Sequence, residues 1–273
     1  MKKYIAYILL FLVPFIVSAQ TDVDLDSELC GRISVGVDKK ITKGVHITLD
    51  EELRQNDNYG SFERLQTNIG AKFKVHPNIK IGFGYSLINP YDTTDKAFAN
   101  ARHRLSFDIA GNLDFGKWNV SLKERLQMTH RTGYFNTYQN PRNALALKSR
   151  LTAKYKYSER LAPFAYLEIR NTLNASVILA NFDGTNYLTD AGSTSGEAGW
   201  FLDGFCGSYL NRIRGAFGAE YSFDRHNSLN ICLLLDRISN KVVDANAEGT
   251  KLKSYTRETG FVAHVALAYV YAF

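Results

Sequence analysis

Cysteine is scarce in this chain. Only Cys30, Cys206 and Cys232 occur in 273 residues, and they lie far apart in the sequence. Three scattered cysteines do not form the even, closely spaced framework of a disulfide-rich domain. A Cys30–Cys206 bridge is an open alternative that we do not favour. Secondary structure and side-chain packing must therefore hold the fold together.

Long apolar runs are also missing. Although 45% of the residues are hydrophobic, no stretch after the N-terminus approaches the ~20 apolar residues that a membrane helix needs. A chain of this kind can still cross a bilayer if its apolar residues occupy alternate positions in the strands of a closed barrel. The 16 Tyr and 17 Phe residues suit such a barrel, because aromatic side chains mark both of its membrane interfaces.

Motifs of known chemistry are absent as well. The sequence has no G-x-S-x-G elbow, no phosphate-binding glycine loop and no zinc-ligand spacing. Asp22, Asp24 and Asp26 alternate but lack the glycine and the closing Glu of a calcium loop. We therefore expect no cofactor, no metal and no catalytic residue. Strand alternation accounts for the interleaved basic and aromatic residues, so no nucleic-acid partner is expected.

One enzymatic alternative stays open, a barrel-embedded lipid hydrolase of the outer membrane. His46 and His264 both fall on a phase that can point inward, and Asp50 and Glu52 share the face of His46. A hydrolase of this kind needs a nucleophile, a base and an orienting group within hydrogen-bonding reach. No serine can be assigned as the partner of either histidine, so we do not favour this alternative.

The first residues read as a secretory signal. Lys2 and Lys3 supply its charge, an apolar stretch follows, and the small residues before Ala19 predict cleavage between Ala19 and Gln20. We thus expect a signal peptide over residues 1–19 and an outer-membrane β-barrel domain over 20–273. Removing the signal lowers the formal charge from +6 to about +4.

The C-terminal stretch from Gly260 to Phe273 has the clearest strand pattern. Large apolar side chains alternate with small or polar ones, as expected where successive residues leave opposite faces of a strand. The run resembles the last strand of Gram-negative outer-membrane barrels, whose closing aromatic is recognised by the insertion machinery. On that resemblance, the insertion signal is Leu267, Tyr269, Tyr271 and Phe273.

The rest of the chain repeats this alternation. We predict strands at residues 32–38, 44–54, 62–75, 78–88, 102–115, 118–130, 144–157, 161–174, 205–224, 227–239 and 256–273. From residue 62 onward, short turns alternate with longer connections. Bacterial barrels sort their connections in this way, with short periplasmic turns and long extracellular loops. The sequence therefore predicts an all-β fold, a closed antiparallel transmembrane barrel of 10–12 strands.

The number of strands depends on how the residues near the N-terminus are assigned. If short turns face the periplasm, the strand at 32–38 runs inward and its N-terminal end lies outside or in the lumen. An extra strand within residues 22–30 gives twelve strands, whereas a partial strand at 32–38 gives ten. We favour twelve, because even counts are the bacterial rule. The connection at 175–204 is unusually long, and either folds into the barrel mouth or forms a surface loop.

The face opposite the apolar residues supplies the lumen, because charges facing hydrocarbon are costly. Glu124 is an exception on the outward phase, which we attribute to a bulge or a rim position. Basic groups outnumber acidic ones on the inward phase, so the lumen is either a structural ion-pair network or a pore that favours small anions. The predicted lumen-lining residues are Arg64, Lys80, Arg104, Asp108, Arg125, Lys148, Arg150, Glu168, Arg170, Arg212, Arg214, Glu220, Asp236 and His264.

Several repeated units also resemble a known family. The segments are Val35–Arg54, Ile79–Tyr85, Leu161–Arg170 and Asn211–Tyr221. They are similar to the domain-of-unknown-function 2490 family of secreted barrel proteins. This resemblance implies an outer-membrane location and no established activity. Together with the strand pattern, it leads us to expect a monomeric, non-enzymatic barrel that serves as a narrow pore or an envelope structural protein.

Overall fold

The computed structural model describes residues 21–25, 27–180, 200–248 and 252–273. The predicted signal peptide and its cleavage site at Ala19 and Gln20 lie outside these ranges, as does much of the 175–204 connection. The described residues form strands, turns and loops, and none of their segments is a helix able to cross a membrane.

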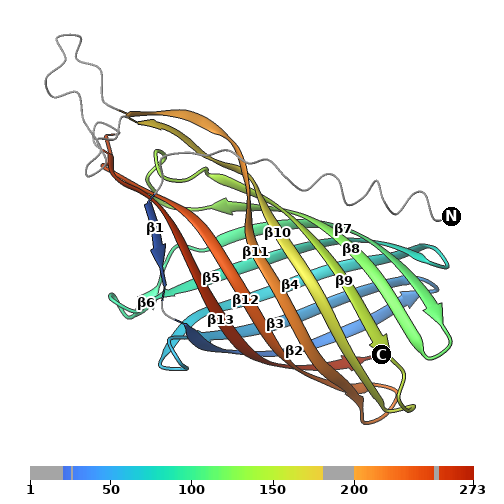
Figure 1. The fold of residues 1–273 in the computed structure, drawn as a ribbon. Coiled ribbons are helices and arrows are strands. Elements are labelled where there is room, and N and C mark those ends of the chain that lie inside the picture. Colours follow the sequence, from blue (N-terminus) through green and yellow to red (C-terminus); the bar gives the residue numbers. More distant parts are fainter. Residues whose placement is uncertain (1–20, 26, 181–199, 249–251) are drawn as a thin grey trace, which may run out of the picture.

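The fold is a closed β-barrel (Figure 1). Its wall contains eleven strands among the described residues, and two further short strands, β1 and β6, lie outside that count. The wall strands are β2 (Glu28–Thr42), β3 (Val45–Asn56), β4 (Ser61–His76), β5 (Ile79–Asp92), β7 (Arg102–Phe115), β8 (Trp118–Arg131), β9 (Asn143–Tyr155), β10 (Leu161–Ala180), β11 (Trp200–Ser222), β12 (Asn227–Ala245) and β13 (Leu252–Ala272). This confirms the predicted all-β barrel of 10–12 strands.

Consecutive wall strands pair antiparallel, but the pair that closes the barrel is parallel. β2 pairs with β13 from Glu28 opposite Val262 to Asp38 opposite Ala272. A wall with an odd number of up-and-down strands must close in this way, because its first and last strands run in the same direction. The C-terminus is part of this seam, since the amide of Phe273 donates to the carbonyl of Asp38 at 3.0 Å.

The seam also resolves the strand count. Residues 22–30 do contain strand, as one alternative required, but β1 (Thr21–Asp24) pairs with the same edge of β13 that β2 follows further along. β1 and β2 therefore pair with successive parts of one edge of β13, and β1 adds no separate wall strand. Both predicted even counts, ten and twelve, bracket the observed eleven.

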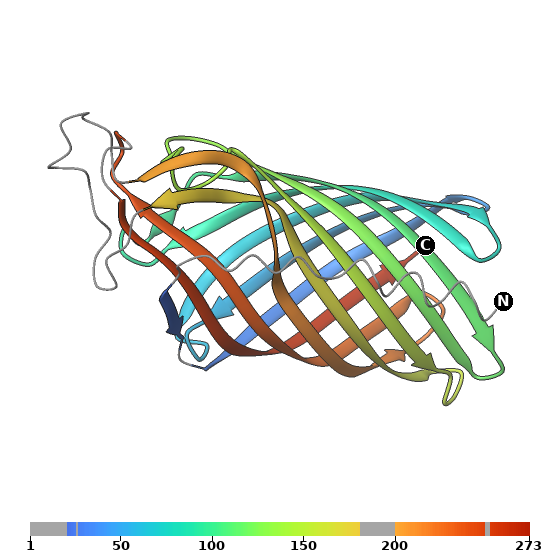
Figure 2. The same ribbon diagram turned by 45° about the horizontal axis from the view of Figure 1, so that its top comes forward.

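The two ends of the barrel differ in their connections. Short turns at 43–44, 77–78, 116–117, 156–160 and 223–226 form one end, which we call the turn end. The connections at 93–101 and 132–142 lie at the other end, the loop end, together with the short strand β6 (Ala97–Phe98). Several wall strands extend further toward the loop end than predicted. Figure 2 shows how strongly all the strands tilt around the barrel.

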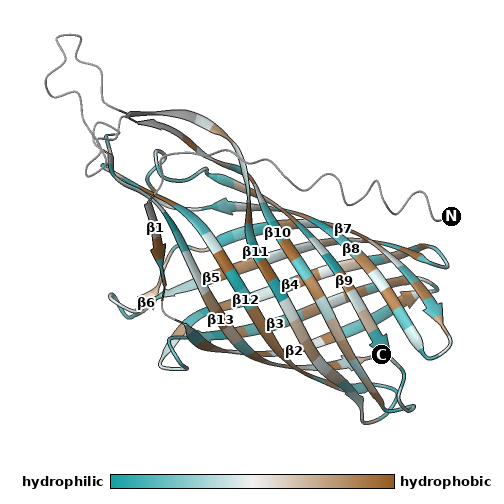
Figure 3. Cartoon of the chain, viewed as in Figure 1, coloured by the Kyte–Doolittle hydropathy of each residue, from teal (hydrophilic) through white to brown (hydrophobic). Residues whose placement is uncertain are grey.

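Side-chain polarity is inverted relative to a water-soluble barrel. Neighbouring residues on β10 illustrate this: Leu167 is 53% exposed, whereas Glu168 is 2% exposed. Exposed large apolar residues such as Val35, Phe83 and Phe261 occupy the outward phase. In Figure 3 this appears as alternating apolar and polar bands along the strands. The strand alternation therefore separates an apolar outer surface from a polar interior.

Candidate functional site: the charged lumen

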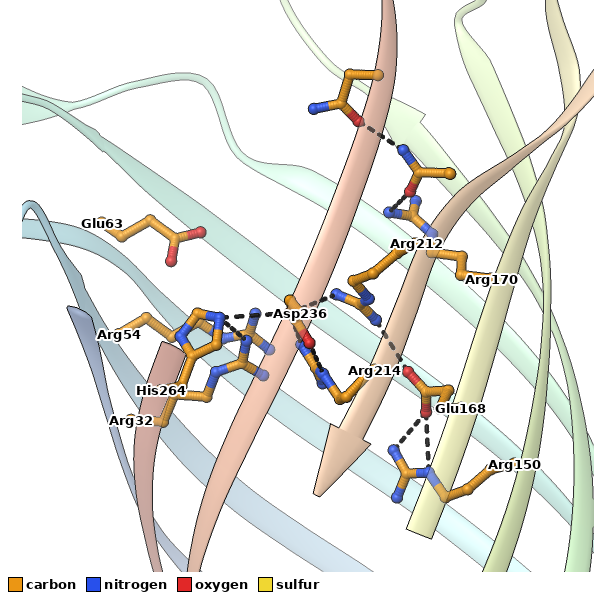
Figure 4. Close-up of polar contacts among 12 residues, drawn as sticks. Arg32, Arg54, Glu63, Arg150, Glu168, Arg170, Arg212, Arg214, Asp236 and His264 are labelled. Carbon is orange, nitrogen blue, oxygen red and sulfur yellow. Dashed lines mark hydrogen bonds and ion pairs between the residues drawn. The ribbon is translucent and has the colours of Figure 1, made fainter. Parts of the chain in front are cut away.

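One wall of the lumen carries a ladder of arginines and carboxylates. Arg214 on β11 makes a bidentate pair with Asp236 on β12, at 2.5 and 2.6 Å. Arg212 lies 3.8 Å from Asp236 and donates to Glu168 of β10 at 2.9 Å. Arg150 of β9 donates to the other oxygen of Glu168, its terminal nitrogen at 2.5 Å. Figure 4 shows this continuous chain of contacts along the inner face.

The strand register explains the ladder. Arg214 stands directly opposite Asp236, and Glu168 stands directly opposite Arg150. Opposite charges in facing positions stabilise a sheet, and both carboxylates are almost fully buried, at 2% exposure each. Buried charges require such partners, because an unpaired carboxylate in a low-dielectric interior is costly.

The ladder continues to the parallel seam through His264 of β13. Its Nε2 atom lies 3.4 Å from Asp236 and 3.1 Å from the guanidinium of Arg32 on β2. Arg32 and His264 each keep one buried ring or guanidinium nitrogen without a hydrogen-bond partner in the described structure. Charged and polar contacts thus connect the first strand of the wall to its last five, across the point of closure.

A second cluster surrounds Asp108 on β7, beside the ladder, because β8 pairs with both β7 and β9. Arg125 of β8 binds this carboxylate in bidentate fashion at 2.5 and 2.7 Å, and Lys123 approaches it to 2.8 Å. Arg104 donates to the hydroxyl of Thr129 at 3.0 Å. Asp108 therefore neutralises part of this wall, whereas the partner of Arg104 among the described residues is the neutral Thr129.

Between these two clusters, four basic residues share one row of the sheet. Arg125 of β8 stands opposite Lys148 of β9, Lys148 opposite Arg170 of β10, and Arg170 opposite Arg212 of β11. Like charges in facing positions destabilise a sheet. Arg125 and Arg212 contact Asp108 and Glu168 directly, so the two central members of the row are the ones without a direct carboxylate contact.

Lys148 and Arg170 have no carboxylate partner within the described ranges. Arg170 donates to the side-chain oxygen of Asn211 at 2.9 Å, and its Nε is buried without a partner. No hydrogen bond or ion pair links the Lys148 ammonium to another described residue. The buried carboxylate of Glu168 contacts Arg150 and Arg212 instead.

The loop between β8 and β9 reaches over the loop-end mouth. Asn136 donates its amide to the carbonyls of Ala245 and Asn246, at 2.8 and 3.1 Å. Gln139 donates to Asp244 at 3.0 Å. Because β10 and β11 lie between β9 and β12 in the sheet, these contacts link two strands that are not neighbours.

The remaining predicted lumen residues are distributed along the barrel. Glu220 accepts from Lys154 at 2.9 Å, and Arg64 lies 3.5 Å from Glu63. Lys80 lies at the turn end, where it lines a separate cavity. The ladder, the Asp108 cluster, the basic row and the turn-end cavity thus contain most of the predicted residues, whereas Arg64 and Glu220 form separate pairs.

Sequence reasoning did not assign Arg32, Arg54 or Asn211 to the lumen. Arg54 contacts Glu52 at 2.5 Å, and strand alternation could have found it, since the two residues share a face. Arg32 was missed because its strand was expected to begin there, whereas β2 begins at Glu28. Asn211 sits at a register shift between β10 and β11, which no period-two pattern can predict.

Glu124 does not sit at a bulge. The pairing of β8 is unbroken on both sides, and Glu124 lies in the middle of the strand, opposite Ile109 and Ser149. Its carboxylate accepts a hydrogen bond from the Ser149 hydroxyl at 2.5 Å. The predicted bulge or rim position is therefore wrong, and a hydroxyl on the next strand supplies the partner instead.

The histidines of the hydrolase alternative lie apart. His46 contacts Asp38 at 2.7 Å near the turn end, whereas His264 lies within the ladder between Arg32 and Asp236. All three cysteines are free thiols, and Cys30 is buried opposite His264. The residues of the proposed insertion signal, Leu267, Tyr269, Tyr271 and Phe273, point outward beside the seam.

The sequence matches one known family over part of its length. A family model described as a protein of unknown function (DUF2490) matches residues 33–187, which is more than half of the chain. The match covers most of β2 through β10, whereas the similar segment Asn211–Tyr221 lies beyond it. No curated protein matches the chain.

Proposed function

From the premise that this chain belongs to the DUF2490 family, we propose that it is an integral outer-membrane barrel forming a narrow, anion-selective pore. The family supplies no activity, so the proposal depends on the chain's own surface and lumen. In the proposed orientation the turn end faces the periplasm and the loop end faces outward.

The outer surface supports the membrane location. Apolar side chains cover the outward phase of the wall, and aromatic pairs gather near the turn end, including Trp118 with Tyr155 and Tyr271 with Phe273. A second aromatic group, Phe62, Tyr91 and Phe98, lies near the loop end. An apolar band between two aromatic girdles is what a lipid bilayer requires of a barrel. Its direct partners are then membrane lipids and, during biogenesis, the barrel insertion machinery.

The single observation that carries the pore is the basic row at Arg125, Lys148, Arg170 and Arg212. A barrel needing only internal stability would alternate charges in such a row. Two adjacent cations without carboxylates instead attract mobile anions and repel cations, as charged rings do in selective channels. Small inorganic anions are the expected permeant species.

A second candidate is favoured by the buried ladder. The chain of contacts from Arg150 to Arg32 fills one side of the lumen with fixed ion pairs. If the remaining space is closed, the protein is an envelope structural barrel and its charges serve packing alone. The two candidates differ in conductance.

Planar-bilayer recording of the full chain tests the pore. We expect single-channel steps, and a reversal potential in a KCl gradient that indicates preference for chloride. The double variant Lys148→Gln/Arg170→Gln should lose most of this preference. Lys117→Gln, in an exposed turn, should retain it. Absence of steps from the folded wild-type protein would favour the structural barrel.

The location is tested separately. We expect the mature chain to fractionate with outer membranes, require detergent for release, and migrate faster before heating than after heating in gels. Light scattering of the detergent complex should give a monomer. Release into the aqueous fraction without detergent would contradict the membrane proposal.

A further inference from the structure

The turn end contains a cavity that the lumen ladder does not include. Its volume is about 760 Å³, and it is formed by the ends of β2 to β5 with the turns at 43–44 and 77–78. The charged residues lining it are Asp38, Lys40, Lys43, His46, Lys72, Lys74, His76 and Lys80. We call it the lysine basin. It gathers five lysines and two histidines around one carboxylate.

The carboxylate of Asp38 already has two basic partners. Asp38 contacts His46 at 2.7 Å and Lys72 at 3.6 Å. The side chains of the other basin lysines, Lys40, Lys43, Lys74 and Lys80, make no hydrogen bond or ion pair with any residue that the structure describes. Lys74 stands directly opposite Lys80, an arrangement that costs stability. The basin therefore has a surplus of positive charge that no described residue balances by a direct contact.

Two lysines elsewhere near the turn end have carboxylate partners. Lys154 pairs with Glu220 at 2.9 Å, and Lys156 lies 4.0 Å from Asp114. These residues occupy the same level of the barrel, on the other side. On that side a carboxylate lies near each of these two lysines, whereas Asp38, the carboxylate that lines the basin, faces five lysines.

The backbone holds the basin in place. The amide of Lys74 donates to the carbonyl of Gly44 at 2.7 Å, which fixes the β2–β3 turn against β4. Gly44 has a φ of +83°, and an added Cβ would lie 3.2 Å from the Cβ of Lys74. Glycine thus permits the close approach that brings Lys43 beside Lys74. The lysine stems start from fixed positions although their ends can move.

We propose that the lysine basin binds a ligand carrying clustered phosphate groups. Lysine ammonium groups act as point charges for phosphate oxygens and need no planar alignment. The several unpaired lysines suit a diphosphate or a phosphorylated headgroup better than a single carboxylate. The phosphate can come from a free solute or from an anionic phospholipid. This inference goes beyond the pore and does not require the lumen to conduct.

Calorimetric titration of the full chain in neutral detergent tests the basin. Inorganic pyrophosphate should bind the wild type, and Lys74→Gln/Lys80→Gln should weaken binding by about tenfold or more, because two charge-assisted contacts are lost. Lys74→Arg/Lys80→Arg should keep most of the affinity. Lys117→Gln, at the turn end but outside the basin, should bind like the wild type. Heat-dependent gel migration verifies that each variant is folded.

A second titration separates the two sources. Short-chain cardiolipin supplies a lipid headgroup with two phosphates, and short-chain phosphatidylcholine is its zwitterionic control. Binding of pyrophosphate alone identifies a free phosphorylated solute, and preferential binding of cardiolipin identifies a lipid. If neither probe binds, or if the folded Lys74→Gln/Lys80→Gln variant binds as tightly as the wild type, the basin is not a phosphate site. This binding measurement does not depend on ion flow through the lumen. A negative result therefore speaks against the basin and not against the pore.

Discussion

Lys148 on β9 stands directly opposite Arg170 on β10 inside the barrel, and neither has a carboxylate partner in the described structure. Both belong to a row whose outer members, Arg125 and Arg212, are neutralised by acidic neighbours. This pair therefore places two like charges opposite each other with no direct carboxylate contact. Because facing like charges cost stability, the pair is central to the proposed function.

Removing one charge of this pair should stabilise the barrel. We expect Lys148→Gln to raise the free energy of unfolding by a few tenths to about 1 kcal/mol, since facing like charges are relieved. Urea unfolding in lipid vesicles, followed by tryptophan fluorescence, measures the change. The same variant should lower anion preference. A folded variant that is less stable than wild type would show that Lys148 has a favourable partner.

Asp236 should be the most sensitive carboxylate. Asp236→Asn leaves the guanidinium of Arg214 buried without its bidentate partner, and weakens the contacts of Arg212 and His264. Breaking one side of a buried pair costs about 3–5 kcal/mol. Glu220→Gln is the matched control, because its pair with Lys154 is partly exposed and should cost about 1 kcal/mol or less. Equal losses in the two unfolding experiments would contradict the ladder's energetic role.

The parallel seam can be tested by cross-linking. Ser34 stands opposite Ala268, so Ser34→Cys/Ala268→Cys should form a disulfide in the folded barrel. Ser34→Cys/Ala272→Cys is the register control and should not, because Ala272 stands opposite Asp38. Peptide mass mapping identifies the bridge and distinguishes it from the native cysteines. A bridge in the control but not in the matched pair would refute this register.

Glu124 offers a test of the membrane-facing surface. Its carboxylate lies on the outward phase, in the middle of β8, with the Ser149 hydroxyl as its partner. If this surface contacts acyl chains, Glu124→Leu should stabilise the barrel in lipid by up to about 2 kcal/mol. Leu122→Glu, on the same face, should destabilise it. Vesicle unfolding of both variants measures the two changes, and a Glu124→Leu variant that is less stable than the wild type would show that Glu124 lies in a polar contact.

Much of the site could be predicted from strand alternation. Arg104 and Asp108 share a face because they are an even number of residues apart, and Leu105 and Phe107 leave the other face for the same reason. This is a local property of extended backbone, so it can be inferred without knowledge of the tertiary structure. The pairing partners could not be predicted in the same way. That Glu168 would contact Arg150 and Arg212 depends on the register of three strands.

From the sequence alone comes the architecture: a period of two over successive segments, with sorted connections, favours a closed sheet with one apolar and one charged face. The tertiary structure alone decided the parallel seam, the unpaired charges of Lys148 and Arg170, and the lysine basin. The physical reason is that each of these depends on which residues, distant along the chain, come opposite one another. Alternation sets the direction of a side chain, but register and closure set its neighbours.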